Sequence, residues 1–223
     1  MKNAIITGTS SGLGLELVKK FSNEKYNIIS LSRSTCSVKS SLVQHYNFDI
    51  TRPKSILGLK KLLESKYKKI DLLINNAGML INKPFVELTK EEFYSVYDVN
   101  FFGVIELIRE ILPFFKSKSQ IINISSIGGI NGTSKFKGLS AYSSSKGALN
   151  VLTEVLAEEF KETGPTINSL CLGSVQTKML EKAFPGYKAQ VQPREMANFI
   201  YDFSQSGASV FNGKVIPVSL LDT

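Results

Sequence analysis

The sequence predicts an α/β fold: a Rossmann-type, doubly wound parallel β-sheet with helices on both faces, a three-layer sandwich. Short runs rich in Ile, Leu and Val alternate with segments of helical periodicity from one end of the chain to the other. These runs have no polar face, which is typical of parallel strands that helices cover on both sides. A length of 223 residues suits one domain with a sizeable core, so we expect a single domain over residues 1–223.

The elements can be assigned in chain order. Apolar runs indicate strands at 2–7, 27–32, 46–48, 70–74, 120–124, 166–172 and 214–218. Helical spacing and starting signals indicate helices at 13–21, 53–67, 89–115, 142–160 and 193–204. Thr51 is the expected N-cap of the second helix, and Thr89 with Glu92 is expected to form a capping box on the third.

Composition excludes several classes of function. The net charge of +8 comes from scattered lysines, so we expect no nucleic-acid partner. Two separated cysteines and one histidine cannot supply a zinc cluster or a Ser/His or Cys/His nucleophilic pair, so no metal is expected. No run is long and apolar enough to span a bilayer, and the amino terminus has no signal-peptide layout. We therefore expect a cytoplasmic protein with no membrane partner.

A glycine-rich turn separates the first expected strand from the first expected helix. It reads Thr-Gly-Thr-Ser-Ser-Gly-Leu-Gly over residues 7–14. Glycines allow the backbone to approach a pyrophosphate closely, and the helix N-terminus offers free amides and a partial positive charge. The expected cofactor-binding residues of this turn are Gly8, Ser10, Ser11, Gly12, Leu13 and Gly14.

Tyr142 and Lys146 lie one turn apart on the long helix expected over 142–160. A tyrosine needs a pKa shift of about three units, or about 4 kcal/mol, to exchange protons near neutrality. The nearby ammonium supplies part of that shift by favouring the phenolate. The pair therefore indicates acid/base catalysis, whereas taken alone it also fits an aromatic residue beside a solvated lysine.

These motifs together resemble those of the short-chain dehydrogenase/reductase family. TGxxxGxG at 7–14, NNAG at 75–78, Asn100, the strand-end pair Ser125-Ser126 and YxxxK at 142–146 follow the family's order over nearly the whole chain. The resemblance implies an NAD(P)-dependent oxidoreductase that reduces a small-molecule carbonyl to an alcohol, or catalyses the reverse oxidation.

The resemblance also assigns the catalytic roles. Tyr142 would protonate the carbonyl oxygen as hydride arrives, and Lys146 would lower the pKa of Tyr142 and hold the nicotinamide ribose. Ser126 would hydrogen-bond the substrate oxygen, with Ser125 as the alternative. Asn100, in mid-helix, would hold a water molecule that links Lys146 to solvent.

Cofactor selectivity is expected at the end of the second strand. An acidic residue there would favour NAD(H), whereas this chain has Ser32 followed by Arg33, which accommodates a 2′-phosphate. We therefore expect NADP(H) to be preferred over NAD(H), with Ser32 and Ser34 as hydrogen-bond donors to the 2′-phosphate. The alternative is that Arg33 is an exposed arginine that binds no ligand. The other cofactor-binding residues that the resemblance implies are Asp49, Ile50, Asn76, Ala77, Gly78, Tyr142, Lys146, Val175 and Thr177.

Three departures from the family pattern concern the substrate side. Ser126 and Tyr142 are sixteen positions apart, more than is usual, so the loop at 128–140 is expected to be extended. Leu172-Gly173 replaces the usual Pro-Gly pair, and the lid at 178–192 is short. The expected pocket walls from this lid are Met179, Leu180, Phe184 and Tyr187.

The resemblance further implies a homodimer or homotetramer, with a dimer through the helices at 100–115 and 142–160. Two other functions stay open at this point. A dinucleotide-binding regulator without turnover would be expected to lack the tyrosine or the lysine. A sugar-nucleotide epimerase or dehydratase would need an additional substrate domain and a different glycine spacing.

Overall fold

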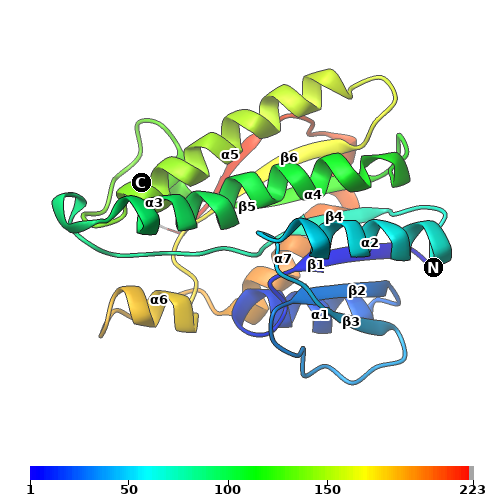
Figure 1. Ribbon diagram of the computed structural model, residues 1–223, viewed down its shortest axis with the longest axis horizontal. Helices are drawn as coiled ribbons and strands as arrows, with labels where there is room; N and C mark the ends of the chain where they lie inside the picture. Colours follow the sequence, from blue (N-terminus) through cyan, green and yellow to red (C-terminus); the bar gives the residue numbers. More distant parts are fainter. Residues whose placement is uncertain (221–223) are drawn as a thin grey trace.

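The protein forms a seven-stranded parallel sheet between two layers of helices (Figure 1). The structure is a computed structural model and describes residues 1–220. The strands are β1 (Asn3–Thr7), β2 (Asn27–Ser32), β3 (Val43–Asn47), β4 (Leu72–Asn75), β5 (Gln120–Ser126), β6 (Thr166–Leu172) and β7 (Val215–Val218). They pair in the order β3-β2-β1-β4-β5-β6-β7, which confirms the expected doubly wound fold.

Two groups of helices cover the two faces of the sheet, and Figure 1 shows them on opposite sides of the strands. One face carries α1 (Gly12–Asn23) and α7 (Pro193–Ser206). The other carries α2 (Pro53–Lys66), α4 (Gly103–Ile111) and α5 (Ser140–Glu159). Two shorter helices, α3 (Lys90–Tyr97) and α6 (Lys178–Ala183), precede α4 and follow β6 respectively.

Side-chain alternation on the central strands fills both layers. Ile5 and Ile6 are neighbours on β1 and both are fully buried, but they belong to different core clusters. Ile6 packs in the cluster that includes α1 and α7, and Ile5 packs in the cluster that includes α2, α4 and α5. Successive strand residues point to opposite faces, so a strand buried on both sides is apolar at most of its positions. This explains the continuous apolar runs in the sequence.

The strand order reverses between β1 and β4, because the chain leaves β1 toward β2 and β3 and returns to place β4 on the other side. In doubly wound sheets the crevice at this switch point, outside the carboxyl ends of the strands, is where ligands bind. The glycine-rich turn after β1, Asn76 after β4 and Ser126 at the end of β5 all lie at that edge.

The predicted helix over 89–115 is divided in the structure. The Thr89–Glu92 capping box is present, and α3 follows it. A π-helical segment, Asp98–Phe102, then connects α3 to α4, and a 3₁₀ turn that contains Pro113 follows α4 over Leu112–Phe114. π-helical segments often mark functional positions, and this one contains Asn100.

The predicted N-cap of α2 is wrong. Arg52 occupies that position and makes no side-chain capping bond, while the hydroxyl of Thr51 donates to Asp49 Oδ1 at 2.8 Å. Asp49 precedes the helix and captures Thr51 in a local turn, as short polar side chains commonly do. The third strand is also longer than predicted and begins at Val43. Within residues 1–220, the structure contains no helix that could cross a membrane.

Candidate active site

A cavity of about 520 Å³ lies outside the carboxyl ends of the strands. It extends from the turn after β2 to the first turn of α5 and α6. Every residue that the sequence predicted to bind the cofactor lines it, as do three of the four predicted catalytic residues. The lining residues from that prediction are Gly8, Ser10, Ser11, Gly12, Leu13, Gly14, Ser32, Arg33, Asp49, Ile50, Asn76, Ala77, Gly78, Ser126, Tyr142, Lys146, Val175 and Thr177.

The glycine-rich turn is held tightly against the protein itself. Gly8 has a φ of 72°, and a Cβ on Gly14 would lie 2.1 Å from the carbonyl oxygen of Gly8. The side-chain amide nitrogen of Asn76, Nδ2, donates hydrogen bonds to the main-chain carbonyl oxygens of Thr7 and Gly8 at 2.9 and 3.2 Å. These contacts explain two of the glycines by steric fit inside the protein, where the sequence suggested only close approach to a pyrophosphate.

Thr7 is a structural residue of the site that the sequence analysis missed. Its hydroxyl oxygen accepts hydrogen bonds from the backbone N–H groups of Asn76 and Ala77 at 3.0 and 2.9 Å. It thereby joins the end of β1 to the turn after β4, on opposite sides of the crevice. The signal in the sequence was Thr7 itself, the first residue of the glycine motif, to which no role had been assigned.

The end of β2 presents one cation to the cavity. Arg33 and Ser34 are exposed, whereas Ser32 is buried, and its hydroxyl donates to the carbonyl oxygen of Ser34 at 2.8 Å and contacts Thr9 Oγ1 at 2.9 Å. The hydroxyl proton of Ser32 is therefore already engaged in a hydrogen bond within the turn. Partial burial acts to raise the pKa of Asp49, but hydrogen bonds from Thr51 and the charge of Arg33 lower it overall. Asp49 is thus an anion beside Arg33 at neutral pH.

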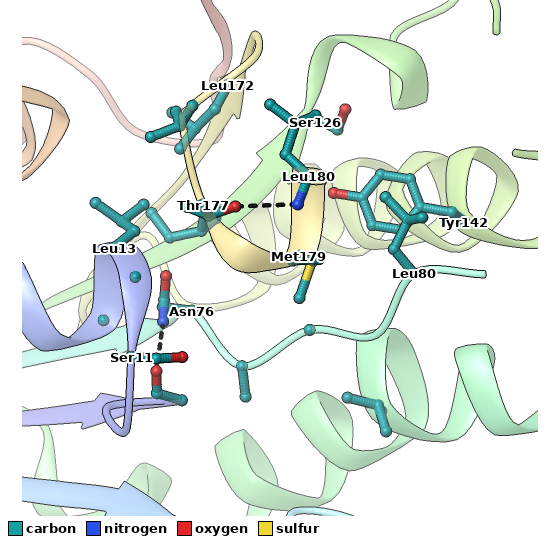
Figure 2. A pocket seen from close by; sticks show the side chains of 18 of the residues that line it. Ser11, Leu13, Asn76, Leu80, Ser126, Tyr142, Leu172, Thr177, Met179 and Leu180 are labelled. Carbon is teal, nitrogen blue, oxygen red and sulfur yellow. Dashed lines mark hydrogen bonds between the residues drawn. The ribbon is translucent and has the colours of Figure 1, made fainter. Parts of the chain in front are cut away.

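Tyr142 and Ser126 meet at the other end of the cavity. Tyr142 lies in the first turn of α5, and Ser126 at the end of β5 is close enough to lower the pKa of the Tyr142 hydroxyl. Figure 2 shows that hydroxyl directed away from α5, toward the turn that carries Thr177 and Leu180. Ser125 instead donates to the main-chain oxygen of Lys146 at 3.3 Å. The structure thus brings Ser126 to Tyr142 and turns Ser125 into the packing between β5 and α5.

Burial dominates the acid/base properties of the Tyr142–Lys146 pair. It raises the pKa of Tyr142 to about 12, against the smaller lowering effect of the Ser126 hydrogen bond. It lowers the pKa of Lys146 to about 8, because an ammonium loses its hydration there. The pKa of Tyr142 therefore lies above its ordinary value, and the lowering expected from Lys146 stays a prediction. The pKa of Tyr142 is raised because burial favours the neutral form of both groups.

Asn100 supports the site from behind rather than lining it. Its side chain accepts from the backbone N–H of Met79 at 2.8 Å and donates to the carbonyl oxygen of Met79 at 2.9 Å. It also donates to Ser145 Oγ at 3.0 Å, and Ser145 in turn donates to the carbonyl oxygen of Tyr142 at 2.7 Å. This fully buried asparagine thus joins the segment after β4 to the first turn of α5.

Three segments form the outer wall of the cavity. Leu80 comes from the segment after β4, Phe136 from the loop after β5, and the predicted walls Met179, Leu180, Phe184 and Tyr187 come from α6 and the residues after it. The segments are tied to one another. Asn82 donates to the carbonyl oxygen of Ala183 at 2.7 Å, Lys83 N–H donates to that of Gly138 at 3.0 Å, and the rings of Phe136 and Phe184 lie 6.4 Å apart.

Comparison with known proteins places this geometry in a family. Residues 2–188 match the family described as short chain dehydrogenase. The D-beta-hydroxybutyrate dehydrogenase of Rhizobium meliloti is 31% identical over 82% of this chain and 75% of its own. A diacetyl reductase [(S)-acetoin forming] of Staphylococcus epidermidis is 24% identical over 96% of both chains.

Solved structures agree on the fold. A 4-hydroxyisoleucine dehydrogenase complexed with NADH superposes with a TM-score of 0.87, at 24% identity over 98% of this chain and 97% of the other. At that identity the likeness establishes the fold alone. The family match and the 31% identical relative establish more, and the chain belongs to the short chain dehydrogenase family of oxidoreductases.

Proposed function

We propose that this protein reduces a carbonyl compound to an alcohol with NADPH, and that Tyr142 is the general acid. The observation that carries the proposal is the proximity of Tyr142 and Ser126 beside the buried Lys146, at one end of a cavity whose other end has the form of a dinucleotide cradle. The names of two relatives, a hydroxybutyrate dehydrogenase and a diacetyl reductase, describe the same kind of reaction.

The residues of the cavity fit a nicotinamide dinucleotide. The turn from Gly8 to Gly14 precedes the N-terminus of α1, and Ser11 at its N-cap makes no side-chain capping bond. Free backbone amides and the helix dipole at such a position favour phosphate groups. Asp49 and Ile50 would flank the adenine, Asn76 to Gly78 would lie along the cofactor, and Val175 with Thr177 would contact the carboxamide.

The residues around Tyr142 have complementary tasks in this reaction. Bound NADPH supplies a hydride to the carbonyl carbon. As that C–H bond forms and the carbonyl π bond breaks, Tyr142 donates its proton to the carbonyl oxygen, and Ser126 donates a hydrogen bond to the same oxygen. A pKa of about 12 keeps Tyr142 protonated at neutral pH, which is the form that reduction needs.

Lys146 and Asn100 would act around that step. The amine of Lys146 is 5.9 Å from the centre of the Tyr142 ring, close enough for its charge to stabilise the phenolate left by proton transfer. We propose that it also holds the nicotinamide ribose. Gly78 lies between Asn100 and Lys146, since a Cβ there would be 3.6 Å from Asn100 Oδ1 and 3.9 Å from Lys146 Nζ. The absence of a side chain at Gly78 supports a water-mediated proton path from Lys146 past Asn100.

The preference for NADP(H) rests on Arg33 and Ser34, which are the exposed polar side chains at the end of β2. An arginine guanidinium and a hydroxyl both donate hydrogen bonds to a phosphate. The engaged hydroxyl of Ser32 makes Ser34 the better of the two serines for this role.

The test is binding followed by turnover on one sample. NADPH and NADH binding is measured by nicotinamide fluorescence, and a panel of ketones, aldehydes, diketones, sugars and acyl thioesters is then followed by loss of nicotinamide absorbance. We expect tighter binding of NADPH and turnover of at least one carbonyl class. Binding without turnover across the panel would contradict the proposal and favour a regulatory dinucleotide-binding protein.

We also propose that the chain acts as one domain in a cytoplasmic homodimer or homotetramer. Phe102 before α4, and Val151 and Val155 one turn apart on α5, are 51%, 59% and 48% exposed. Apolar side chains on adjacent helices support an interface there. Sizing by light scattering would test it, because Val151→Glu with Val155→Glu should convert an oligomer to monomers.

A further inference from the structure

The cavity around Tyr142 has an apolar outer wall. This substrate wall consists of Leu80, Phe136, Met179, Leu180, Phe184 and Tyr187. The only polar group that these side chains bring is the hydroxyl of Tyr187, which is 3.3 Å from Ser174 Oγ. Figure 2 shows Leu80, Met179 and Leu180 around the same opening as Tyr142 and Ser126. A substrate whose carbonyl reaches Tyr142 must therefore place the rest of its surface against hydrocarbon and aromatic rings.

The charged residues that line the cavity are Arg33, Asp49, Lys146 and Lys178. Arg33 and Asp49 belong to the far end, after β2 and β3. Lys146 lies inside the fold, where its amine donates to the carbonyl oxygen of Ile124 at 2.8 Å. Arg33 and Asp49 therefore lie away from the substrate wall, and Lys146, at the same end of the cavity as Tyr142, is only 4% exposed.

Lys178 is the remaining charge, and we assign it to the dinucleotide end from the contact that the preceding residue makes. It follows Thr177, whose methyl carbon would be 3.3 Å from a Cβ on Gly12 in the glycine-rich turn. The residue before α6 thus lies beside the glycine-rich turn, while Met179 and Leu180, which follow Lys178, belong to the substrate wall. An exposed lysine at that position suits a dinucleotide phosphate.

The other lysines of the nearby segments, Lys83, Lys135, Lys137, Lys182 and Lys188, do not line the cavity, and two of them are engaged elsewhere. Lys83 forms an ion pair with Glu92 at 2.9 Å. Lys135 donates to the carbonyl oxygens of Ile130 and Thr133 at 2.7 and 2.8 Å, within its own loop. Neither residue is among those that line the cavity.

We infer that the substrate is a neutral, predominantly apolar ketone or aldehyde, and that the substrate wall discriminates against carbonyl compounds that carry a carboxylate. The inference rests on the proposed carbonyl reduction. A carboxylate against this wall would lose its hydration and find no cation to replace it. Leaving one charge of this kind unpaired lowers affinity by about 30-fold or more. In this respect the protein differs from the relative named for hydroxybutyrate.

A matched pair of ketones tests the inference. In 7-oxooctanoate the terminal methyl group of 2-octanone is replaced by a carboxylate, and 7-oxooctanamide is a neutral polar control of the same length. Reduction with saturating NADPH should show a kcat/KM for 2-octanone about 30-fold or more above that for 7-oxooctanoate. Equal or reversed values would overturn the inference while leaving the proposed reduction intact.

Two variants sharpen the comparison. Met179→Arg places a cation in the substrate wall and should raise the relative kcat/KM for 7-oxooctanoate by about tenfold. Phe85→Arg adds the same charge at a side chain that is 70% exposed and does not line the cavity, and it should change nothing. If the parent protein preferred 7-oxooctanoate and Lys178→Gln lost that preference, Lys178 would be shown to bind the substrate carboxylate. That result would also overturn the inference.

A binding measurement separates failure of the inference from failure of the proposed function. Calorimetry with saturating NADP⁺ compares 2-octanol with 7-hydroxyoctanoate, and it needs no turnover. Binding of the neutral alcohol alone would support the inference even if neither ketone were reduced, an outcome that would count against the proposed reduction. Binding of both alcohols with equal affinity would overturn the inference.

Discussion

The side-chain amine of Lys146 donates a hydrogen bond to the main-chain carbonyl oxygen of Ile124 at 2.8 Å. This bond joins α5 to β5 and holds a lysine that is 4% exposed beneath the ring of Tyr142. It gives the amine one partner where water would give several, so the ammonium is disfavoured. The protein thus keeps a titratable amine at its candidate active site at the expense of stability.

Replacing Lys146 by Met should change how stability depends on pH. The folded-state pKa of Lys146 is about 8 against 10.5 for the ordinary side chain, so the unfolded chain binds more protons between these values and stability rises with pH. From pH 8 to 10 the rise is about 2 kcal/mol. Urea unfolding without nucleotide should show this rise in the parent and not in Lys146→Met.

The window for that measurement ends near pH 10. Above it, the raised pKa of Tyr142 acts in the opposite direction, because the unfolded chain loses the tyrosine proton first and stability falls with pH. Lys178→Met, which removes an exposed lysine, is the matched control and should keep the parental rise. A rise of the same size in Lys146→Met would refute the assignment of the lowered pKa to this group.

Arg33→Asp should weaken NADPH binding by about 10- to 100-fold, because it removes a charge-assisted hydrogen bond and adds a carboxylate beside Asp49. Binding of NADH should change far less. Arg52→Asp is the control, since Arg52 forms an ion pair with Asp49, at 3.4 Å, but does not line the cavity. Fluorescence titration measures both cofactors. An unchanged NADPH affinity in Arg33→Asp would show that other residues bind the 2′-phosphate of NADPH.

Ser126→Ala should lower kcat by about 10² to 10³, because it removes a donor aimed at the oxygen that becomes negative during the reaction. Ser125→Ala should leave kcat within a few-fold of the parent, since its hydroxyl serves the main chain of Lys146. Its loss should instead lower the free energy of unfolding by about 1 kcal/mol. Steady-state kinetics and urea unfolding of the two variants separate these roles, and a larger loss of kcat in Ser125→Ala would reverse the assignment.

Gly14→Ala should destabilise the protein by about 1 to 3 kcal/mol, because its methyl group would collide with the carbonyl oxygen of Gly8 at 2.1 Å. Gly58→Ala is the matched control on α2, where a Cβ meets nothing within 4 Å. That substitution should stabilise the protein by about 0.5 to 1 kcal/mol through helix propensity. Thermal or urea unfolding of both variants checks the pair. Equal effects would show that the tight fit at Gly14 is absent in solution.

The sequence predicts most of the fold because its signals are local. Apolar runs locate the strands other than β3, which carries Gln44, His45 and Asn47 and is located only in part, and the Thr89–Glu92 box locates the start of α3. Local signals fail where another contact competes. Thr51 is a residue type that is favoured at N-caps, but its hydroxyl donates a hydrogen bond to Asp49 and does not cap the helix. The π-helical segment at Asn100 accompanies bonds from that side chain to Met79 and Ser145, which lie far away in sequence.

The cavity was predictable residue by residue from motifs, but its energetics were not. Spacing places Lys146 one turn from Tyr142 and suggests that the ammonium favours the phenolate. The direction of the Tyr142 pKa is set by how deeply β5, α5 and the outer segments enclose the pair, which depends on the whole fold. The choice between Ser125 and Ser126 likewise needed the orientation of each side chain at the end of β5.

The most direct test of the account is reduction of a turned-over carbonyl substrate by Tyr142→Phe, measured together with NADPH binding on the same preparation. The substitution removes one hydroxyl and keeps the ring, so the cavity wall is preserved. We predict loss of kcat by about 10² or more, with NADPH affinity within a few-fold of the parent. Retained kcat with intact NADPH binding would contradict the assignment of Tyr142 as the general acid, and with it the central claim.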